Sequence, residues 1–316
     1  MTGQYAHNHG VVDNEPEDQP VGLGAPTLQG YLHGSGYKTG VFGKFLNKWP
    51  VEYNPSNFDE WMLLAARTEG GGFYNARWND QGTVVTRPEY STNIAFNRAD
   101  AFIRSQEGPW YASVAPFAPH SPYTPEAKYA NTPVSYWGGN PATREQRKGD
   151  KPLFVRESDH PLSEGQFIRR QQIRSLRTVY EQRDRLIATL KATGQYDNTI
   201  ILFLSDNSYM WREHGLTRKV RPYDPSIRVG AYLKGPGLSG GSDSSITANI
   251  DVLPTLLNMV GVPYDGSIVD GRDMRTVSRS AILTEWSGVL EGYRQWASIR
   301  TSSFQYIEWY RVDGSI

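Results

Sequence analysis

The sequence predicts an α/β protein built on a mostly parallel β-sheet. Three apolar runs, at residues 39–42, 110–115 and 199–204, have the length and the β-branched or aromatic content of buried strands. A segment with helical spacing precedes each run, and this alternation is typical of parallel sheets. The 316 residues suffice for one large α/β domain, or for one large and one small domain.

The first part of the chain predicts a loop, a helix, a strand and a hairpin. Residues 11–26 are acidic and rich in Pro and Gly, which indicates a loop. Residues 27–32 have the spacing of a short helix that leads into the strand at 39–42. Residues 51–90 mix Asn, Gly and aromatic residues without a clear period, and we interpret them as an excursion that contains a hairpin.

The middle of the chain predicts two helix–strand units separated by an irregular segment. Apolar residues form a helical stripe over 93–105, before the strand at 110–115. Residues 131–162 are polar and rich in Pro and Gly, which indicates irregular structure. Ser163 and Gln166 resemble a capping box that opens a long helix.

That helix is expected to end at Gly194, the left-handed residue after a last turn, and to lead into the strand at 199–204. The length and composition of this run predict burial on both faces. A further strand is expected at 229–233, and an amphipathic helix at 251–260 that ends at Gly261. From Ala281 onward the sequence alternates as strands do.

Asp206 and Asn207 follow the apolar run 199–204 directly. In an open α/β sheet, ligands bind just beyond the carboxyl ends of such strands. A carboxylate and an amide oxygen are hard donors that suit Ca²⁺ or Mg²⁺. The alternative is that Asp-Asn merely opens a turn.

Composition excludes several classes of function. Lysine plus arginine and aspartate plus glutamate each number 33, so the formal net charge is 0 and a nucleic-acid-binding protein is not indicated. The chain has no cysteine, which excludes disulfides and thiolate metal sites. No apolar stretch approaches the roughly 20 residues of a membrane span. The oligomeric state is left open.

Four segments, in order, carry a resemblance to a known family. They are Met1-Thr2-Gly3-Gln4-Tyr5, Gly36-Tyr37-Lys38-Thr39-Gly40-Val41-Phe42-Gly43-Lys44, Ala118-Pro119-His120-Ser121-Pro122, and Ser205-Asp206-Asn207 followed by Lys219 and Lys234-Gly235-Pro236-Gly237. Together they resemble the sulfatases of the alkaline-phosphatase superfamily, in the branch of N-acetylglucosamine-6-sulfatases and arylsulfatases. The resemblance implies a mostly parallel sheet with helices on both faces.

The resemblance also implies roles for individual residues. Lys44 and Lys219 would hold the sulfate oxygens and His120 would lie against the bridging oxygen, so these three are the candidate catalytic and substrate-binding residues. His214 is a further candidate for substrate binding. Asp206 and Asn207 would supply half of a Ca²⁺ site, with Mg²⁺ as the alternative. The substrate would be a sulfate monoester of a sugar or of an aryl alcohol.

The family's Cys-x-Pro-Ser-Arg signature and its strand with paired aspartates do not occur in this chain. In the family, that cysteine becomes formylglycine, the nucleophile. We therefore expect the chain to be a sulfatase segment truncated at its N-terminus and inactive alone. An α/β domain is expected over 1–275, and the start of a C-terminal subdomain over 276–316. An open slot or exposed apolar sheet surface is expected beside Asp206.

Some residues depart from the family pattern. Ser208, Arg212 and Arg218 stand at positions where relatives often carry glycine, so an altered loop path is expected at Ser208 and Arg212. Met210 stands where histidine is common. His7 and His9 are expected to support the site rather than to act directly.

Two other functions remain open from the sequence. One is a phosphoester or phosphonate-ester hydrolase of the same superfamily, and the other is a non-catalytic protein that binds sulfated glycans. The identity of the upstream nucleophile, Cys or Ser versus Thr, would separate the first of these from a sulfatase, and the absence of cysteine supports the second. The family suggests a secreted, periplasmic or lysosomal location, which this sequence does not specify.

Overall fold

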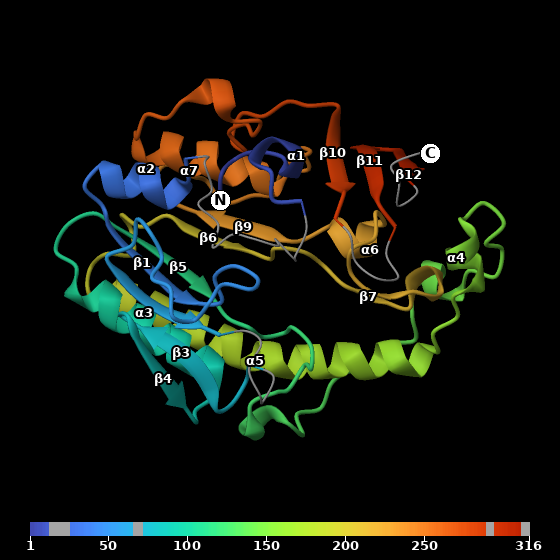
Figure 1. Ribbon diagram of the computed structural model, residues 1–316, viewed down its shortest axis with the longest axis horizontal. Helices are drawn as coiled ribbons and strands as arrows, with labels where there is room; N and C mark the ends of the chain where they lie inside the picture. Colours follow the sequence, from blue (N-terminus) through green and yellow to red (C-terminus); the bar gives the residue numbers. More distant parts are fainter. Residues whose placement is uncertain (13–25, 66–71, 289–293, 311–316) are drawn as a thin grey trace.

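The computed structural model describes residues 1–12, 26–65, 72–288 and 294–310 (Figure 1). It is an α/β fold, as predicted, with a mixed central sheet between two layers of helices and an antiparallel sheet near its C-terminal end. Most of the predicted loop at 11–26 lies outside the described residues.

The central sheet has five strands in the order β4-β3-β2-β1-β5. They are β1 (Lys38–Gly43), β2 (Glu60–Leu64), β3 (Ala76–Asp80), β4 (Thr83–Arg87) and β5 (Trp110–Ala115). β1 lies between β2 and β5 and runs parallel to both, whereas β3 and β4 extend the sheet in antiparallel fashion. β3 and β4 form the hairpin expected within 51–90, because Gln81 and Gly82 adopt the left-handed conformations that a tight turn needs.

The strand that carries Asp206 belongs to a separate two-stranded sheet. β6 (Ile201–Leu204) pairs antiparallel with β9 (Ala231–Lys234), which begins two residues later than predicted. In the described part of the chain β6 has no other strand partner, and β5 pairs only with β1. Every residue of β5 and β6 is partly exposed, so the prediction of a buried strand at 110–115 and that of burial on both faces at 199–204 are wrong.

Helices cover both faces, as the resemblance implied (Figure 1). On one face α3 (Ser91–Ser105) and α5 (Leu162–Ala192) pack against the largest core cluster, in which Phe42, Trp78 and Phe102 are almost fully buried. On the other face α2 (Leu28–Gly34) and α7 (Val252–Val260) meet through a smaller cluster of leucines. Side chains of β5 and β6 both pack on the larger cluster.

Three helix ends follow the expected chemistry. Thr27 caps α2 by accepting a hydrogen bond from Gly30 N (3.2 Å). Gly194 and Gly261 follow α5 and α7 with φ of +71° each, as predicted. The capping box predicted at Ser163 is wrong, because α5 begins at Leu162 behind Pro161 and has no side-chain cap. Proline supplies the fixed φ that starts the helix two residues earlier than a capping box at Ser163 would.

The remaining described elements are short. They are α1 (Ala6–His9), η1 (Ala127–Tyr129), η2 (Pro141–Arg144), α4 (Leu153–Glu157), β7 (Met210–Trp211), η3 (Glu213–Gly215), β8 (Thr217–Arg218), α6 (Asp224–Ile227), η4 (Asn249–Asp251) and η5 (Gly266–Ile268). The segment 131–162 is largely irregular, as expected.

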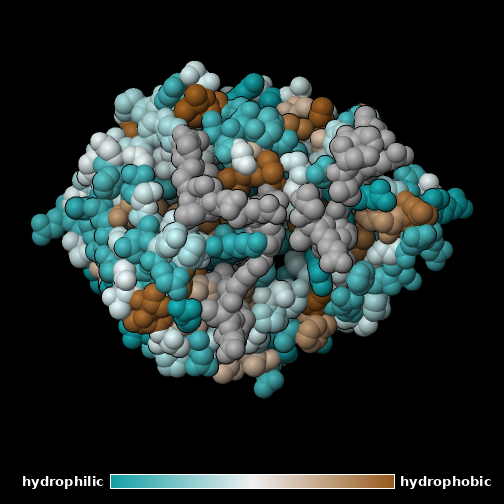
Figure 2. All heavy atoms as spheres, viewed as in Figure 1, coloured by the Kyte–Doolittle hydropathy of each residue, from teal (hydrophilic) through white to brown (hydrophobic). Residues whose placement is uncertain are grey.

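The C-terminal strands form a third sheet, in the order β10 (Ala281–Trp286), β11 (Trp296–Thr301) and β12 (Gln305–Trp309), all antiparallel. This agrees with the strands expected after Ala281. Among the described residues, no helix has the length and apolar character that a membrane crossing requires. The face in Figure 2 is mainly hydrophilic, with small and scattered hydrophobic patches.

Candidate active site

Lys44 lies immediately beyond the carboxyl end of β1. Its N–H donates to Ala115 O (2.8 Å), which ties it to the end of β5. Gly43 makes this approach possible, since its φ is +107° and a Cβ there would lie 2.1 Å from Ala115 O. A glycine at the last position of β1 is therefore what places Lys44 against the end of β5.

His120 lies in the loop that follows β5. Its N–H donates to Phe117 O (2.9 Å), and its ring packs on that of Phe117 with 5.0 Å between centroids. Nδ1 lies 3.0 Å from Ser121 O, and since a carbonyl only accepts, Nδ1 carries the proton. In the neutral ring Nε2 is then the acceptor.

Asp206 and Asn207 lie beyond the carboxyl end of β6. Asp206 Oδ1 accepts from Asn207 N (2.9 Å) and Nδ2 (3.3 Å), and Ser205 Oγ donates to Asn207 O (2.7 Å). Asn249 Nδ2 donates to Asp206 O (3.1 Å), so the loop is also tied to η4. These bonds form a compact turn that leaves the Asp206 carboxylate exposed.

Lys219 follows β8, between two residues with left-handed backbone. Arg218 has φ of +76° and Val220 +66°, which is rare for a β-branched residue and costs about 1–3 kcal/mol. A hydrogen bond from β11 holds the segment in place, because Trp296 Nε1 donates to Val220 O (3.3 Å). Such strain persists only where the surrounding structure imposes it, which makes the placement of Lys219 well defined.

Four of the six predicted side chains come close enough to influence one another's charge. Burial lowers the pKa of His120, and the charges of Lys219 and Lys44 lower it further, while Asp206 acts in the opposite direction. Burial also lowers the pKa of Lys219, and Asp206 partly offsets this. With two ammonium groups and one carboxylate, the cluster carries net positive charge. They were expected at the carboxyl edge of one mostly parallel sheet, but the strands that they follow belong to three sheets. β1 and β5 belong to the central sheet, β6 pairs with β9, and β8 pairs with β7.

The pKa of His120 should therefore lie below 6.5 and should respond to its neighbours with predictable sign. Lys44→Ala should raise this pKa by removing a positive charge, and Asp206→Asn should lower it. Between the pKa of His120 in the folded state and that in the unfolded state, the folded state binds fewer protons. The contribution of His120 therefore lowers the free energy of unfolding as pH falls below about 6.5. NMR titration of the His120 ring protons measures this pKa in the parent chain and in both variants. An unchanged pKa in Lys44→Ala would contradict the prediction.

His214 makes its contacts elsewhere. Its Nδ1 lies 2.5 Å from Glu145 Oε2, and its ring packs on Tyr223 with 4.7 Å between centroids. Lys151 binds the other oxygen of Glu145 (3.2 Å). Burial raises the pKa of Tyr223 to about 12. His214 thus belongs to a polar cluster with Glu145 and Lys151.

The two N-terminal histidines lie beside the C-terminal sheet. His7 Nδ1 contacts Glu285 Oε1 (2.7 Å) in β10, and burial lowers the pKa of His9. Arg212 keeps a left-handed φ of +106°, so it retains the conformation that glycine would favour. Ser208 has no such φ, and its N–H donates to Ser226 O (3.0 Å).

The sequence reasoning missed a tyrosine pair that joins the histidine loop to the Asp206 loop. The hydroxyls of Tyr123 and Tyr209 are 2.5 Å apart, and the rings meet edge to face. Each tyrosine follows its motif residue, His120 or Asp206, by three positions. That parallel spacing was the available signal, but only the fold brings residues 86 positions apart together.

The described residues supply only part of a metal site. Asp206 and Asn207 offer a carboxylate and an amide oxygen, which suit Ca²⁺ or Mg²⁺ in kind. Among the residues described, no group of three or more His, Cys, Asp or Glu side chains is arranged to hold a metal ion. Because Ca²⁺ takes 6–8 oxygens, the pair does not complete a site.

The fold and the cluster define an α/β protein with a cationic site at strand ends, suited to a small anion. A family model for sulfatases matches residues 1–262, and the chain belongs to the sulfatase family. The solved structures it resembles, including one with a TM-score of 0.83 and 20% identity, share this fold. That neighbour was solved in complex with its substrate D-glucosamine-2-N,6-O-disulfate, and the match covers 98% of this chain and 78% of the other.

Two relatives illustrate the similarity in sequence. The human N-acetylglucosamine-6-sulfatase is 27% identical over 322 residues, covering 93% of this chain and 58% of that protein. A putative extracellular sulfatase Sulf-1 homolog of Caenorhabditis elegans is 28% identical over 291 residues, covering 83% of this chain and 40% of that protein. The chain thus spans about half the length of these relatives.

Proposed function

We propose that the site binds the sulfate group of a sulfated sugar, as part of a protein that hydrolyses sulfate monoesters. The observation that supports this most directly is that Lys44, Lys219 and Asp206 all lie close enough to His120 to shift its pKa. We infer that a small anion bound among these groups contacts both lysines and the imidazole together.

Each group suits one need of ester cleavage. The ammonium groups of Lys44 and Lys219 would neutralise the non-bridging oxygens, which gain charge in the transition state. In the protonated imidazolium, Nε2–H of His120 would donate to the bridging oxygen, because the Nδ1 proton is directed at Ser121 O. The lowered pKa of Lys219 makes its ammonium a readier proton donor than an exposed lysine.

The substrate class follows from the relatives. The human relative is named for N-acetylglucosamine 6-sulfate, and the structural neighbour binds a 6-O-sulfated glucosamine. We therefore propose a glycan sulfate ester as the substrate of the complete protein.

We also propose that an α/β domain covers residues 1–275 and that a C-terminal subdomain begins at residue 276. The separate sheet that begins at Ala281 supports this boundary.

Binding of N-acetylglucosamine 6-sulfate to the 316-residue chain tests this proposal. Lys44→Ala and Lys219→Ala should each weaken binding about 10- to 100-fold, because each removes a hydrogen bond to a charged group. Isothermal titration calorimetry measures the loss.

Lys191→Ala is the matched control. Lys191 lies in the last turn of α5 with its ammonium over the Tyr196 ring (5.0 Å), near the amino end of β6 and therefore away from the strand ends that carry the site. Equal weakening by Lys191→Ala, or tight binding that survives Lys219→Ala, would contradict the proposed site. An aryl phosphate that binds far more tightly than the sulfate would favour the phosphoester alternative.

Calcium should bind the chain only weakly, in the millimolar range or above, because Asp206 and Asn207 supply two of the 6–8 oxygens that it takes, and about 10⁻³ M is the weak limit of protein sites. Asp206→Ala should abolish the remaining binding, whereas Asp184→Ala on the surface of α5 should not. Calorimetry with CaCl₂ measures both. Micromolar affinity that persists in Asp206→Ala would place the cation elsewhere.

A further inference from the structure

Two tyrosine hydroxyls join the loop that carries His120 to the loop that carries Asp206. Tyr123 Oη and Tyr209 Oη are 2.5 Å apart, and the two rings are nearly perpendicular with 5.9 Å between centroids. Among the described strands no ladder joins β5 to β6, so the sheets themselves leave these two loops unconnected. The tyrosine pair supplies a polar link across that division.

The backbone ties Tyr123 to His120. Tyr123 N donates to His120 O (2.8 Å), which closes a turn around the histidine. Tyr123 has φ of +65°, an uncommon conformation for an aromatic residue, which persists only where surrounding contacts impose it. The next residue makes one such contact, because Tyr90 Oη donates to Thr124 O (2.9 Å). The position of the Tyr123 ring and that of His120 therefore depend on each other.

Tyr209 lies at the base of the β7–β8 hairpin, which leads to Lys219. Met210 pairs with Arg218 at the open end of this hairpin, and one position further along Tyr209 stands opposite Lys219. Asp206 precedes Tyr209 by three positions. Tyr209 is therefore connected to Asp206 through a short stretch of backbone and to Lys219 through the hairpin.

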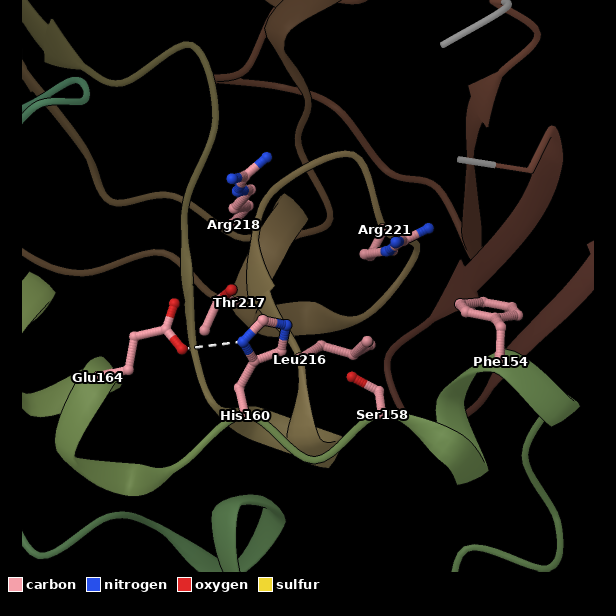
Figure 3. Close-up of a pocket in the computed structure, with 8 residues that line it drawn as sticks. All are labelled: Phe154, Ser158, His160, Glu164, Leu216, Thr217, Arg218 and Arg221. Atoms are coloured by element: carbon pink, nitrogen blue, oxygen red, sulfur yellow. Dashed lines mark hydrogen bonds and ion pairs between the residues drawn. The ribbon is translucent and has the colours of Figure 1, made fainter. Parts of the chain in front are cut away.

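One side of the hairpin faces a cavity of about 310 Å³ (Figure 3). Arg218 and Arg221 lie along one side of this cavity, and His160 lies along the other. Groups that face a cavity lack packing partners there, so hydrogen bonds at the two ends of the hairpin contribute to its position. At the tip, His160 N donates to Gly215 O (3.1 Å), and at the base the hydroxyl of Tyr209 makes the bond to the histidine loop.

We propose that the hydrogen bond between Tyr123 and Tyr209 positions His120 relative to Asp206 and Lys219, and thereby sets the width of the anion site. The inference rests on the proposed function and deepens it, because it names the residues that hold the two sides of that site together. The two tyrosines are positioning residues, which act through His120 and Lys219 rather than on the substrate. Removal of either hydroxyl breaks the same bond and lets the two loops separate.

Binding of N-acetylglucosamine 6-sulfate to the 316-residue chain, measured by calorimetry, tests the pair. Tyr123→Phe and Tyr209→Phe keep the rings and lose the bond, so each should weaken binding about 3- to 10-fold. The double variant should bind no more weakly than either single variant, because both changes break one bond. Tyr129→Phe is the matched control and should leave binding unchanged, since it removes a bond to Glu181 Oε2 (2.9 Å) at the surface of α5.

The pKa of His120 gives a second readout that needs no ligand. Burial lowers this pKa, and the carboxylate of Asp206 acts in the opposite direction, so Asp206→Asn should lower it further. In Tyr209→Phe the same substitution should lower it less, because the interaction between two charges weakens as they move apart. NMR titration of the His120 ring protons measures both differences, and Tyr129→Phe should leave the response as it is in the parent chain.

Two outcomes would overturn the positioning role while the proposed function stands. One is a double variant whose loss of binding free energy equals the sum of the two single losses, since the tyrosines would then act independently. The other is Tyr209→Phe that changes neither the affinity nor the response of the His120 pKa to Asp206→Asn. Absence of any binding that depends on Lys219 would instead remove the proposed function, and the NMR comparison would still decide whether the pair positions His120.

Discussion

The purified 316-residue chain should hydrolyse no aryl sulfate above the uncatalysed rate. It contains no cysteine, so it lacks the residue that the resemblance implies as the precursor of a formylglycine nucleophile. Covalent catalysis divides a difficult step into two easier ones, and loss of a nucleophile typically lowers the rate on the order of 10⁴- to 10⁶-fold. The two lysines and His120 would still bind the anion.

A chromogenic aryl sulfate, assayed with and without millimolar CaCl₂, measures this rate. Lys219→Ala is the informative variant, because any residual activity from a contaminating sulfatase would be unaffected by it. Turnover in the purified chain that Lys219→Ala abolishes would show that the chain has a nucleophile of its own.

Gly43→Ala should destabilise the fold by about 2–6 kcal/mol, the combined cost of a strained left-handed residue and of overpacking. A Cβ at Gly43 would lie 2.1 Å from Ala115 O, and φ at this position is +107°. Relief requires β1 and β5 to separate, which would also break the bond from Lys44 N to Ala115 O. Binding of N-acetylglucosamine 6-sulfate should weaken in the same variant.

Gly34→Ala is the matched control. Gly34 ends α2, has no left-handed φ, and has open space where a Cβ would lie, so alanine should stabilise by about 0.4–1 kcal/mol. Urea denaturation of both variants measures the difference. Equal stability of Gly43→Ala and the parent chain would mean that β1 and β5 do not approach as closely as described.

Local patterns predicted most elements of the fold. β1 and β5 lie within about one residue of their predicted bounds, and the glycines that end α5 and α7 are those predicted. α3 ends as predicted and starts two residues early. These elements depend on residue spacing and on backbone preference at single positions, which are properties of short segments. The start of α5 was misassigned because Pro161 competed with Ser163 as the initiating residue.

Patterns did not predict how strands pair. The apolar run at 199–204 was expected to lie within one parallel sheet, whereas β6 pairs with β9 in antiparallel fashion and stays partly exposed. An apolar run shows that a strand has surface to bury, but it does not show which segment will cover that surface. The choice of partner depends on loops and helices across the whole chain.

The sequence by itself determined which side chains stand at the ends of strands, because Lys44, His120 and Asp206 each follow an apolar run directly or by a short loop. Only the tertiary structure decided what these side chains meet. It brought Lys44, Lys219 and Asp206 around His120, directed His214 to Glu145, joined Tyr123 to Tyr209, and placed Arg218 and Arg221 on one cavity. The physical reason is that the residue pattern of a strand is a property of a short segment, whereas contacts between residues distant in sequence require the packing of the whole domain.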